Sequence, residues 1–217
     1  MFKLNGRGGR GSAAASVLIV AALQAAASTA TSQSHAYRVD PSRSHTTIHV
    51  GKAGAFSFVA GHTHQVSGPI ENGSVDVDLD QPSDARIRLA IATSELQVSP
   101  AGEPKDDPPK VQEAMRSEQV LDVANHPRIT FESTGVTVKS RRAALLDLIV
   151  AGQLTIRAVS QPVSVPVHVE IADGSLTASG HFVVKQSAFG IKPISVGGVV
   201  AVKDALDIDF SIVATSQ

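Results

Sequence analysis

The 217-residue chain contains no cysteine and no tryptophan, and its aromatic residues are seven Phe and one Tyr. The lack of cysteine excludes disulfides, a thiolate nucleophile and cysteine-based zinc sites. So few aromatic side chains also argue against a surface that stacks nucleic-acid bases. An excess of charge of one sign is missing too, because 19 basic and 20 acidic residues give a formal net charge of −1. We therefore expect no nucleic-acid partner.

The sequence also lacks the common catalytic motifs. It has no Gly-x-Ser-x-Gly, no phosphate-binding loop, no dinucleotide fingerprint and no His-Glu-x-x-His. No pair of residues can be assigned as nucleophile and base or as acid and base, so the sequence does not predict an enzyme. What is present is a globular composition, with 42% hydrophobic and 18% charged residues, in a length that suits one domain.

The first residues have the composition of a targeting segment. Met1–Ser12 carries three basic residues and no acidic one, and Ala13–Ala27 is almost wholly apolar and is followed by small residues. This order predicts a secretory signal peptide, with an uncleaved membrane anchor as the alternative. We expect 1–36 to be a signal peptide and short flexible start, and 37–217 to be one periplasmic or secreted domain. Without the three basic residues, 16 of the 19 remain against 20 acidic ones, a net charge of −4.

Strict alternation of apolar and polar residues indicates β-strands in the remainder. Between Val163 and Ile171 every second residue is Val or Ile, and Ser, Pro, His and Glu lie between them. A period of two places the branched residues on one buried face and the others toward water. The same alternation or a short apolar run occurs in Thr46–Val50, Ala55–Ala60, Val75–Leu79, Ile87–Ile91, Ile129–Glu132, Leu146–Ile156, Leu176–Val184 and Leu206–Ile212.

Turn residues separate these segments, at Glu71–Ser74, Gln81–Asp84, Ala172–Ser175 and Val196–Gly198. Many short strands, each with one apolar face, predict an all-β sandwich or barrel with antiparallel pairing. The segment Lys110–Leu121 differs, because it has neither Pro nor Gly and its apolar residues have helical spacing. It predicts one short amphipathic helix, placed over a barrel mouth or a sheet edge.

The sharpest local feature is Gly61-His62-Thr63-His64. In an extended segment His62 and His64 point the same way, so both imidazoles could bind one metal ion. His45 or His49, which share a strand face, could supply a third ligand. The alternative is a pair of polar residues at a strand end or barrel rim.

Four short motifs follow one another in order along the chain. They are Tyr37-Arg38-Val39-Asp40-Pro41 with Ser44-His45, Val120-Leu121-Asp122 with His126-Pro127-Arg128-Ile129-Thr130-Phe131-Glu132-Ser133, Ala151-Gly152-Gln153-Leu154-Thr155-Ile156, and Phe189-Gly190-Ile191. Together they resemble the YceI-like family, lipocalin-like exported proteins associated with binding polyisoprenoid lipids. The resemblance extends from Tyr37 to about Ala214. The Gly-His-Thr-His segment replaces the family's usual Gly-x-Phe hairpin, which suggests a divergent branch.

The resemblance implies a closed antiparallel lipocalin-like barrel of about eight strands, whose interior is either filled by side chains or open for one ligand. It also implies non-enzymatic binding or carriage of a long-chain apolar lipid, a polyisoprenoid or isoprenoid quinone, in the cell envelope. The candidate lining residues are the inward apolar positions, each of which could instead belong to an ordinary core: Phe56, Phe58, Ile87, Leu89, Ile91, Phe131, Val165, Val167, Phe182 and Phe189.

Two other hypotheses stay open at this point. One is a metal-binding envelope protein that uses His62 and His64, and the other is a ligand-free β scaffold with a stress-response role. The lipid hypothesis adds transient contact with a membrane. A barrel without free edges favours a monomer or a homodimer. A hollow interior would favour the lipid hypothesis, and a filled one would favour the scaffold.

Overall fold

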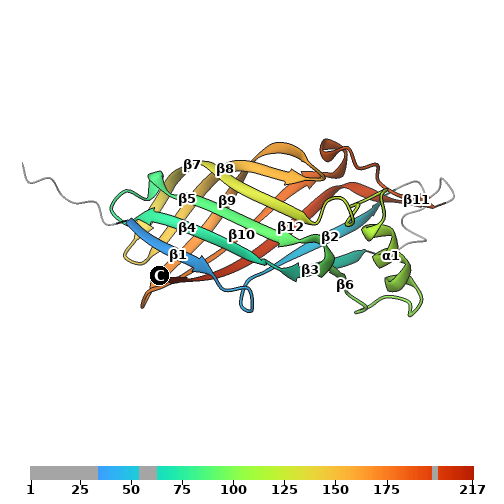
Figure 1. Cartoon of the computed structure of the whole chain (residues 1–217), viewed down its shortest axis with the longest axis horizontal. Coiled ribbons are helices and arrows are strands. Elements are labelled where there is room, and N and C mark those ends of the chain that lie inside the picture. The colour runs from blue at the N-terminus through green and yellow to red at the C-terminus, as the bar shows by residue number, and fades with distance from the viewer. Residues whose placement is uncertain (1–33, 54–62, 197–199) are drawn as a thin grey trace, which may run out of the picture. The chain divides into compact units, whose positions relative to one another are not determined.

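The computed structural model describes residues 34–53, 63–196 and 200–217, and every structural statement below concerns these residues (Figure 1). The strands are β1 (Ser34–Val39), β2 (His45–Ala53), β3 (His64–Pro69), β4 (Asn72–Asp78), β5 (Arg86–Ala92), β6 (Gln97–Val98), β7 (Arg128–Arg142), β8 (Leu145–Ile156), β9 (Val159–Ala172), β10 (Ser175–Lys185), β11 (Ser195–Val196) and β12 (Val200–Ser216). The helices are α1 (Asp107–Arg116) and the short 3-10 turns η1 (Pro82–Asp84), η2 (Thr93–Glu95) and η3 (Gln186–Phe189). In this part of the chain no helix has the length and apolar character needed to cross a membrane.

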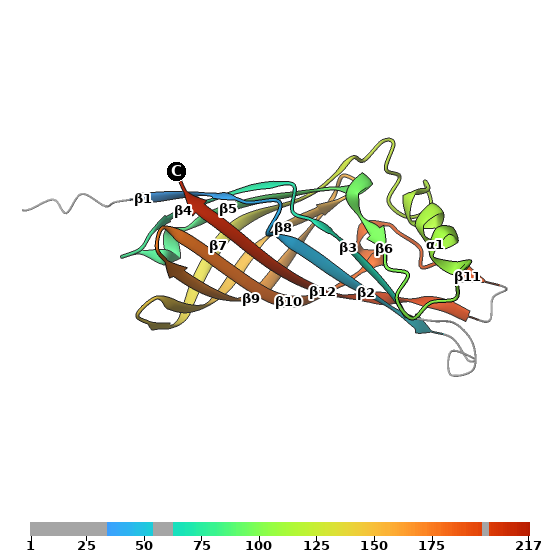
Figure 2. The same ribbon diagram turned by 90° about the horizontal axis from the view of Figure 1, so that it is seen from below.

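The strands form a closed antiparallel barrel, as predicted. Hydrogen-bonded neighbours run in the order β1-β4-β5-β7-β8-β9-β10-β12, and β12 pairs with β1 as well. One edge of β12 pairs with β2 along its first part and with β1 at its end, so β1 and β2 share one place in the wall. β3 and β4 share the next place in the same way. The described residues therefore make an eight-stranded wall, which Figure 2 shows from the side of β12 and β2.

A buried serine joins β1 and β2 across the break between them. Ser44 is 2% exposed, and its hydroxyl donates to the carbonyl of Val213 (3.2 Å) and accepts from the N–H of the same residue (2.9 Å). The N–H of Asp40 also donates to the carbonyl of Val213 (2.8 Å), and together these bonds satisfy the backbone groups of Val213 between the end of β1 and the start of β2. This contact explains why a serine precedes His45 in the first of the four motifs.

The strand predictions are confirmed for the described residues, while Ala55–Ala60 and most of the turn at Val196–Gly198 lie outside them. The β9–β10 turn has positive φ at Asp173 (51°) and Gly174 (72°), the conformation of a two-residue hairpin turn. The predicted turn at Glu71–Ser74 is wrong, because β4 already begins at Asn72. A Cβ on Gly73 would lie 2.7 Å from the Leu89 side chain, so the glycine serves close strand approach here.

The helix is confirmed, but its predicted bounds are wrong. α1 begins at Asp107 instead of Lys110, since Pro108 and Pro109 lie in the first turn, where a missing N–H breaks no helical bond. It ends at Arg116, because Ser117 is extended and its hydroxyl bonds the carbonyl of Ala114 (2.7 Å).

β1 begins three residues earlier than the expected domain boundary. Ser34, His35 and Ala36 pair with Asp78, Val77 and Asp76 of β4. These three residues belong to the barrel wall rather than to a flexible start. The signal peptide stays a prediction, because residues 1–33 lie outside the described part of the chain.

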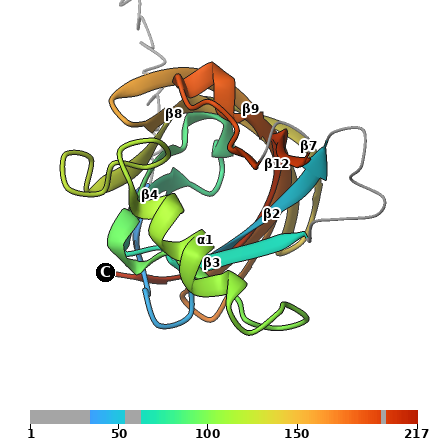
Figure 3. The ribbon, with the colours of Figure 1, turned by 90° about the vertical axis from the view of Figure 1, so that its right-hand side faces the viewer.

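α1 crosses one end of the barrel (Figure 3) and lies beside β6 (Figure 2). The side chain of Gln112 holds the helix to the β6 segment, donating to the carbonyl of Leu96 (2.8 Å) and accepting from the N–H of Val98 (2.7 Å). Met115 packs with Leu96 in the apolar cluster under the helix. We call this the helix end, and the opposite end, with the β7–β8 and β9–β10 hairpins, the turn end.

Candidate ligand-binding cavity

The barrel encloses a cavity of about 1060 Å³. Its wall comes from the inward positions of the strands, which the alternating sequence fills with Val, Ile, Leu and Phe. The polar residues that line it, among those the structure describes, are Thr46, Lys52, His64, Asp107, Lys110, Thr130, Arg141 and Gln186. The interior is therefore hollow and mostly apolar.

The barrel dimensions make this cavity long and narrow. An eight-stranded barrel leaves an interior only wide enough for side chains or for one small ligand across. The 12 residues of β8 span ~40 Å at a rise of about 3.4 Å per residue. A strand tilt of about 40° leaves a wall ~30 Å tall. A cavity of this volume in such a barrel suits an extended chain better than a compact molecule.

Eight of the ten candidate lining residues line the cavity, and Phe56 and Phe58 lie outside the described residues. The eight are Ile87, Leu89, Ile91, Phe131, Val165, Val167, Phe182 and Phe189. Five of them, including both Phe131 and Phe182, keep partly accessible side chains although they point inward. Inward apolar groups retain accessible surface where nothing packs against them, as expected beside a void. That they bind a ligand stays a prediction.

Two glycines keep phenyl rings against the wall. A Cβ on Gly152 of β8 would lie 2.4 Å from ring atoms of Phe131 of β7, so this ring occupies the space of a side chain at position 152. The motifs that contain Phe131 and Gly152 thus meet across two adjacent strands. A glycine across from an aromatic residue lets the ring cover the backbone instead of projecting into the lumen.

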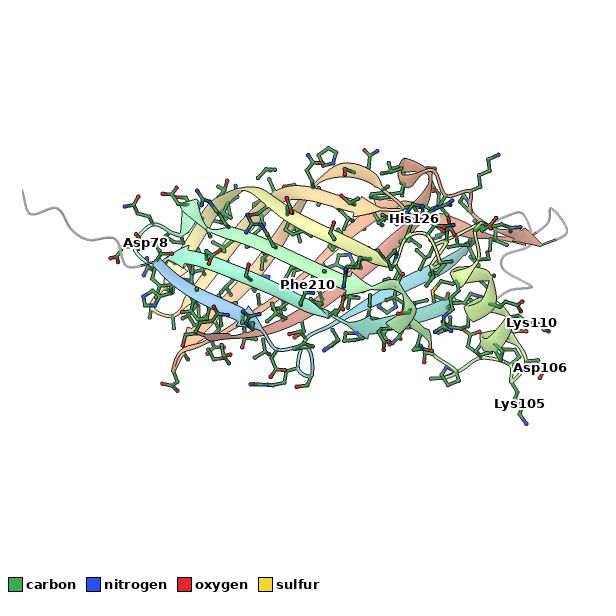
Figure 4. The ribbon with its side chains drawn as sticks, viewed as in Figure 1. Asp78, Lys105, Asp106, Lys110, His126 and Phe210 are labelled. Atoms are coloured by element: carbon green, nitrogen blue, oxygen red, sulfur yellow. The ribbon has the colours of Figure 1, made fainter. Side chains whose placement is uncertain are left out.

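Phe210 is a lining residue that the sequence analysis did not select. Its ring lies 2.7 Å from a Cβ built on Gly180, its register partner in β10, and it makes an edge contact with Phe182 at 6.4 Å between ring centroids. Figure 4 shows Phe210 about midway along the barrel. Its place in the alternating segment Leu206–Ile212 was the signal that could have identified it.

The polar lining residues gather at the helix end. Lys52 lies next to the last residue of β2, His64 begins β3, and Asp107 and Lys110 lie in the first turn of α1. Lys110 is labelled at this end in Figure 4, opposite Asp78. At the turn end the polar lining residue is Arg141, whose guanidinium donates to the backbone carbonyl of Leu79 (2.6 Å).

His64 is paired with a buried carboxylate. Its Nδ1 lies 2.8 Å from Oε1 of Glu103, and the side chains are 14% and 3% exposed. The loop that carries Glu103 is fixed beside β3, because the N–H of Ser99 donates to the carbonyl of Gln65 (2.7 Å). Within the described residues, Oε2 of Glu103 is buried and has no hydrogen-bond partner. Sequence reasoning missed Glu103, which lies 39 residues from His64.

The predicted third metal ligand is wrong. His49 points outward from β2, where its Nε2 lies 3.1 Å from Asp209, while His64 lines the cavity on the other face of the sheet. His45 shares the outward face with His49, so neither can meet His64. His62 lies outside the described residues, and inside them no three His, Asp or Glu side chains are placed to hold a metal ion.

A polar contact fixes the Phe-Gly-Ile turn at the helix end. Asp204 accepts hydrogen bonds from the hydroxyl of Ser187 (2.6 Å) and from its N–H (2.8 Å), and these bonds lower the pKa of the Asp204 carboxyl. Gly190 adopts a left-handed conformation (φ 73°) that ends η3. The turn thereby directs Gln186 and Phe189 into the cavity.

Comparison with known proteins gives a family and a fold. The model of the YceI-like domain matches residues 37–214. The structure resembles BcnA of Burkholderia cenocepacia with a TM-score of 0.59 and 21% identity, over 82% of this chain and 99% of that one. It resembles a polyisoprenoid-binding domain from Saccharophagus degradans, implicated in plant cell wall breakdown, with a TM-score of 0.54 and 12% identity, over 83% and 98%. No curated protein sequence matches the chain.

Proposed function

The chain belongs to the YceI-like domain family, and from this membership and the apolar cavity we propose that the barrel binds one long apolar lipid of the polyisoprenoid class, such as a polyprenol or an isoprenoid quinone. The observation that carries the proposal is the cavity of about 1060 Å³ with an apolar wall. The similar barrel from Saccharophagus degradans, a polyisoprenoid-binding domain, supports the same class of ligand.

Burial of the chain supplies the affinity. Removing ~400 Å² of apolar ligand surface from water gives about 10 kcal/mol at about 25 cal/mol per Å². Association costs take back a part of this, and the remainder still permits useful affinity without a specific polar contact. The function is therefore passive and non-enzymatic: the barrel holds or carries the lipid.

The hollow interior disfavours the ligand-free scaffold, for which a filled core was expected. The side chains that would fill such a core, Phe131 and Phe210, lie over glycines at the wall. The predicted signal peptide supports a place in the periplasm or outside the cell, where a water-soluble carrier of an apolar chain could exchange it with membranes.

The test is to fill the lumen and measure the bound lipid. Ala178 lines the cavity and is 7% exposed, while its neighbour Thr177 in β10 points outward. Wild-type protein purified under native conditions should release an isoprenoid lipid into organic solvent, detected by mass spectrometry. Ala178→Trp should lose that lipid because the indole blocks the lumen.

Thr177→Trp is the matched control and should retain the lipid. Circular dichroism would show that both variants are folded. Wild-type protein that neither contains lipid nor takes up an added prenol would contradict the proposed function.

A further inference from the structure

A carboxylate–histidine pair lies at the helix end of the cavity, whose wall is mostly apolar. Among the residues that the structure describes, Glu103 carries the buried side-chain oxygen that has no hydrogen-bond partner. This oxygen is enclosed by the protein and Glu103 does not line the cavity, so the carboxylate can act on a ligand only through His64. His64 does line the cavity, and its contact with Glu103 fixes the imidazole at the helix end.

The pair defines which hydrogen bonds the site can make. An ionised carboxylate only accepts, so the proton in the contact with Glu103 is on Nδ1 of His64. In the neutral tautomer that donates from Nδ1, the other ring nitrogen, Nε2, is an acceptor. The site therefore suits a ligand group that donates a hydrogen bond.

The acceptor at Nε2 also disfavours a phosphate head group. An ionised phosphate presents oxygens that accept hydrogen bonds, so it does not match Nε2 of His64.

We propose that His64, oriented by Glu103, binds the hydroxyl of the lipid's head group, so that the barrel selects long-chain alcohols or quinols over ethers and phosphates with the same chain. The inference rests on the proposed function and adds to it the class of head group. The alcohol O–H donates to Nε2 of His64, and the chain extends from there toward the turn end. Glu103 is a positioning residue, because its Oε1 fixes the His64 tautomer.

The experiment compares three probes that share one chain. Lipid-free protein is titrated with geranylgeraniol, its methyl ether and geranylgeranyl phosphate, each displacing an apolar fluorescent dye. Wild-type protein should bind the alcohol about tenfold more tightly than the ether, the value of one hydrogen bond of about 1.4 kcal/mol. The phosphate should bind no more tightly than the alcohol.

His64→Phe should abolish the preference for the alcohol and leave the affinity for the ether unchanged. His64→Gln, whose amide oxygen accepts, should restore part of the preference, and Glu103→Gln should reduce it. A merely structural role of either residue would change the affinities for alcohol and ether together. His49→Phe is the matched control, because it makes the same change in the neighbouring strand on the outer face of the barrel.

Each alternative result is informative. Equal binding of alcohol and ether by wild-type protein, an unchanged preference in His64→Phe, or tighter binding of the phosphate would overturn the head-group inference and leave the proposed function standing. Failure to bind any of the three probes would contradict the proposed function itself.

Discussion

The two ends of the barrel are closed in different ways. At the turn end the wall closes through the continuous ladder, because β1 pairs with both β4 and β12. At the helix end the covering segment consists of β6 and α1, and β6 contributes only two residue pairs to β3. Two hydrogen bonds of Gln112 and apolar contacts of Met115 hold this cover.

This difference predicts where the barrel opens. Opening the turn end would break the pairing that makes the barrel closed, whereas the helix end can open by displacement of α1 and of β6, which adds only two residue pairs to the ladder. Segments with few backbone pairings open at a lower free energy than the central strands. Polar lining residues lie at the same end, so under the proposed function a lipid would enter with its chain first and leave its head group at the cover.

The largest effect is expected at the closed junction of the turn-end half. Tyr37 of β1 is 3% exposed and packs in the apolar cluster that includes Val39 and Val75. Tyr37→Ala should lower the free energy of unfolding by about 3–5 kcal/mol, the usual loss for a buried aromatic residue. Urea denaturation measures the change, and all probes of unfolding should shift together.

Tyr37→Phe is its control and should lose less than about 1.5 kcal/mol, because the ring is kept. If Tyr37→Ala unfolded only β1 while the other strands remained protected, the turn end would not be a continuous part of the wall.

The lumen between the two ends is expected to show an intermediate effect. Gly152→Ala places a Cβ within 2.4 Å of Phe131 and 2.6 Å of the carbonyl of Glu132, so the ring must leave the wall. Overpacking of this kind costs about 1–3 kcal/mol, and the displaced ring should also narrow the lumen and weaken lipid binding. The denaturation midpoint and the lipid retained on purification measure the two effects.

The matched control is Gly135→Ala in β7. Nothing lies within 4 Å of a Cβ at Gly135, so stability and lipid content should not fall. Unchanged lipid content in a destabilised Gly152→Ala protein would mean that the Phe131 ring does not control the width of the lumen.

The sequence predicts the wall better than the ends. Alternation, as in Val163–Ile171, depends only on the period of a strand, so local pattern identifies the inward faces. The helix bounds failed because Pro108 and Pro109 read as loop residues, although both fit a first helical turn. The sequence pattern likewise predicts a turn at Gly73. A glycine is required there because side chains of neighbouring strands, distant in sequence, leave no room for a Cβ.

The residues of the candidate site also fall into those that local sequence pattern predicts and those that it does not. Phe131, Phe182 and Phe189 were found as lining residues from local pattern and from the family resemblance. Glu103 was not found, because its contact with His64 depends on how the β6 loop folds back on β3. His49 and His64 lie on opposite faces of the sheet because of the register in which β2 pairs with β3. The alternation of residues in the sequence does not give this register.

The smallest effect is expected at the cover of the helix end. Gln112→Ala removes both hydrogen bonds to the β6 segment and leaves the N–H of Val98, a partly buried group, without its partner. The cost should be about 0.5–1.5 kcal/mol, the usual net value of a hydrogen bond, and should act on local opening, because the wall ladder does not include these bonds. Hydrogen exchange should therefore accelerate in β6 and α1 and stay unchanged in β8 and β9. Bound lipid should also exchange faster with added lipid.

Gln119→Ala, at an exposed position just beyond α1, is the control and should change neither rate. Equal acceleration throughout the strands would show that the two ends open as one unit and that the distinction between wall and cover is wrong.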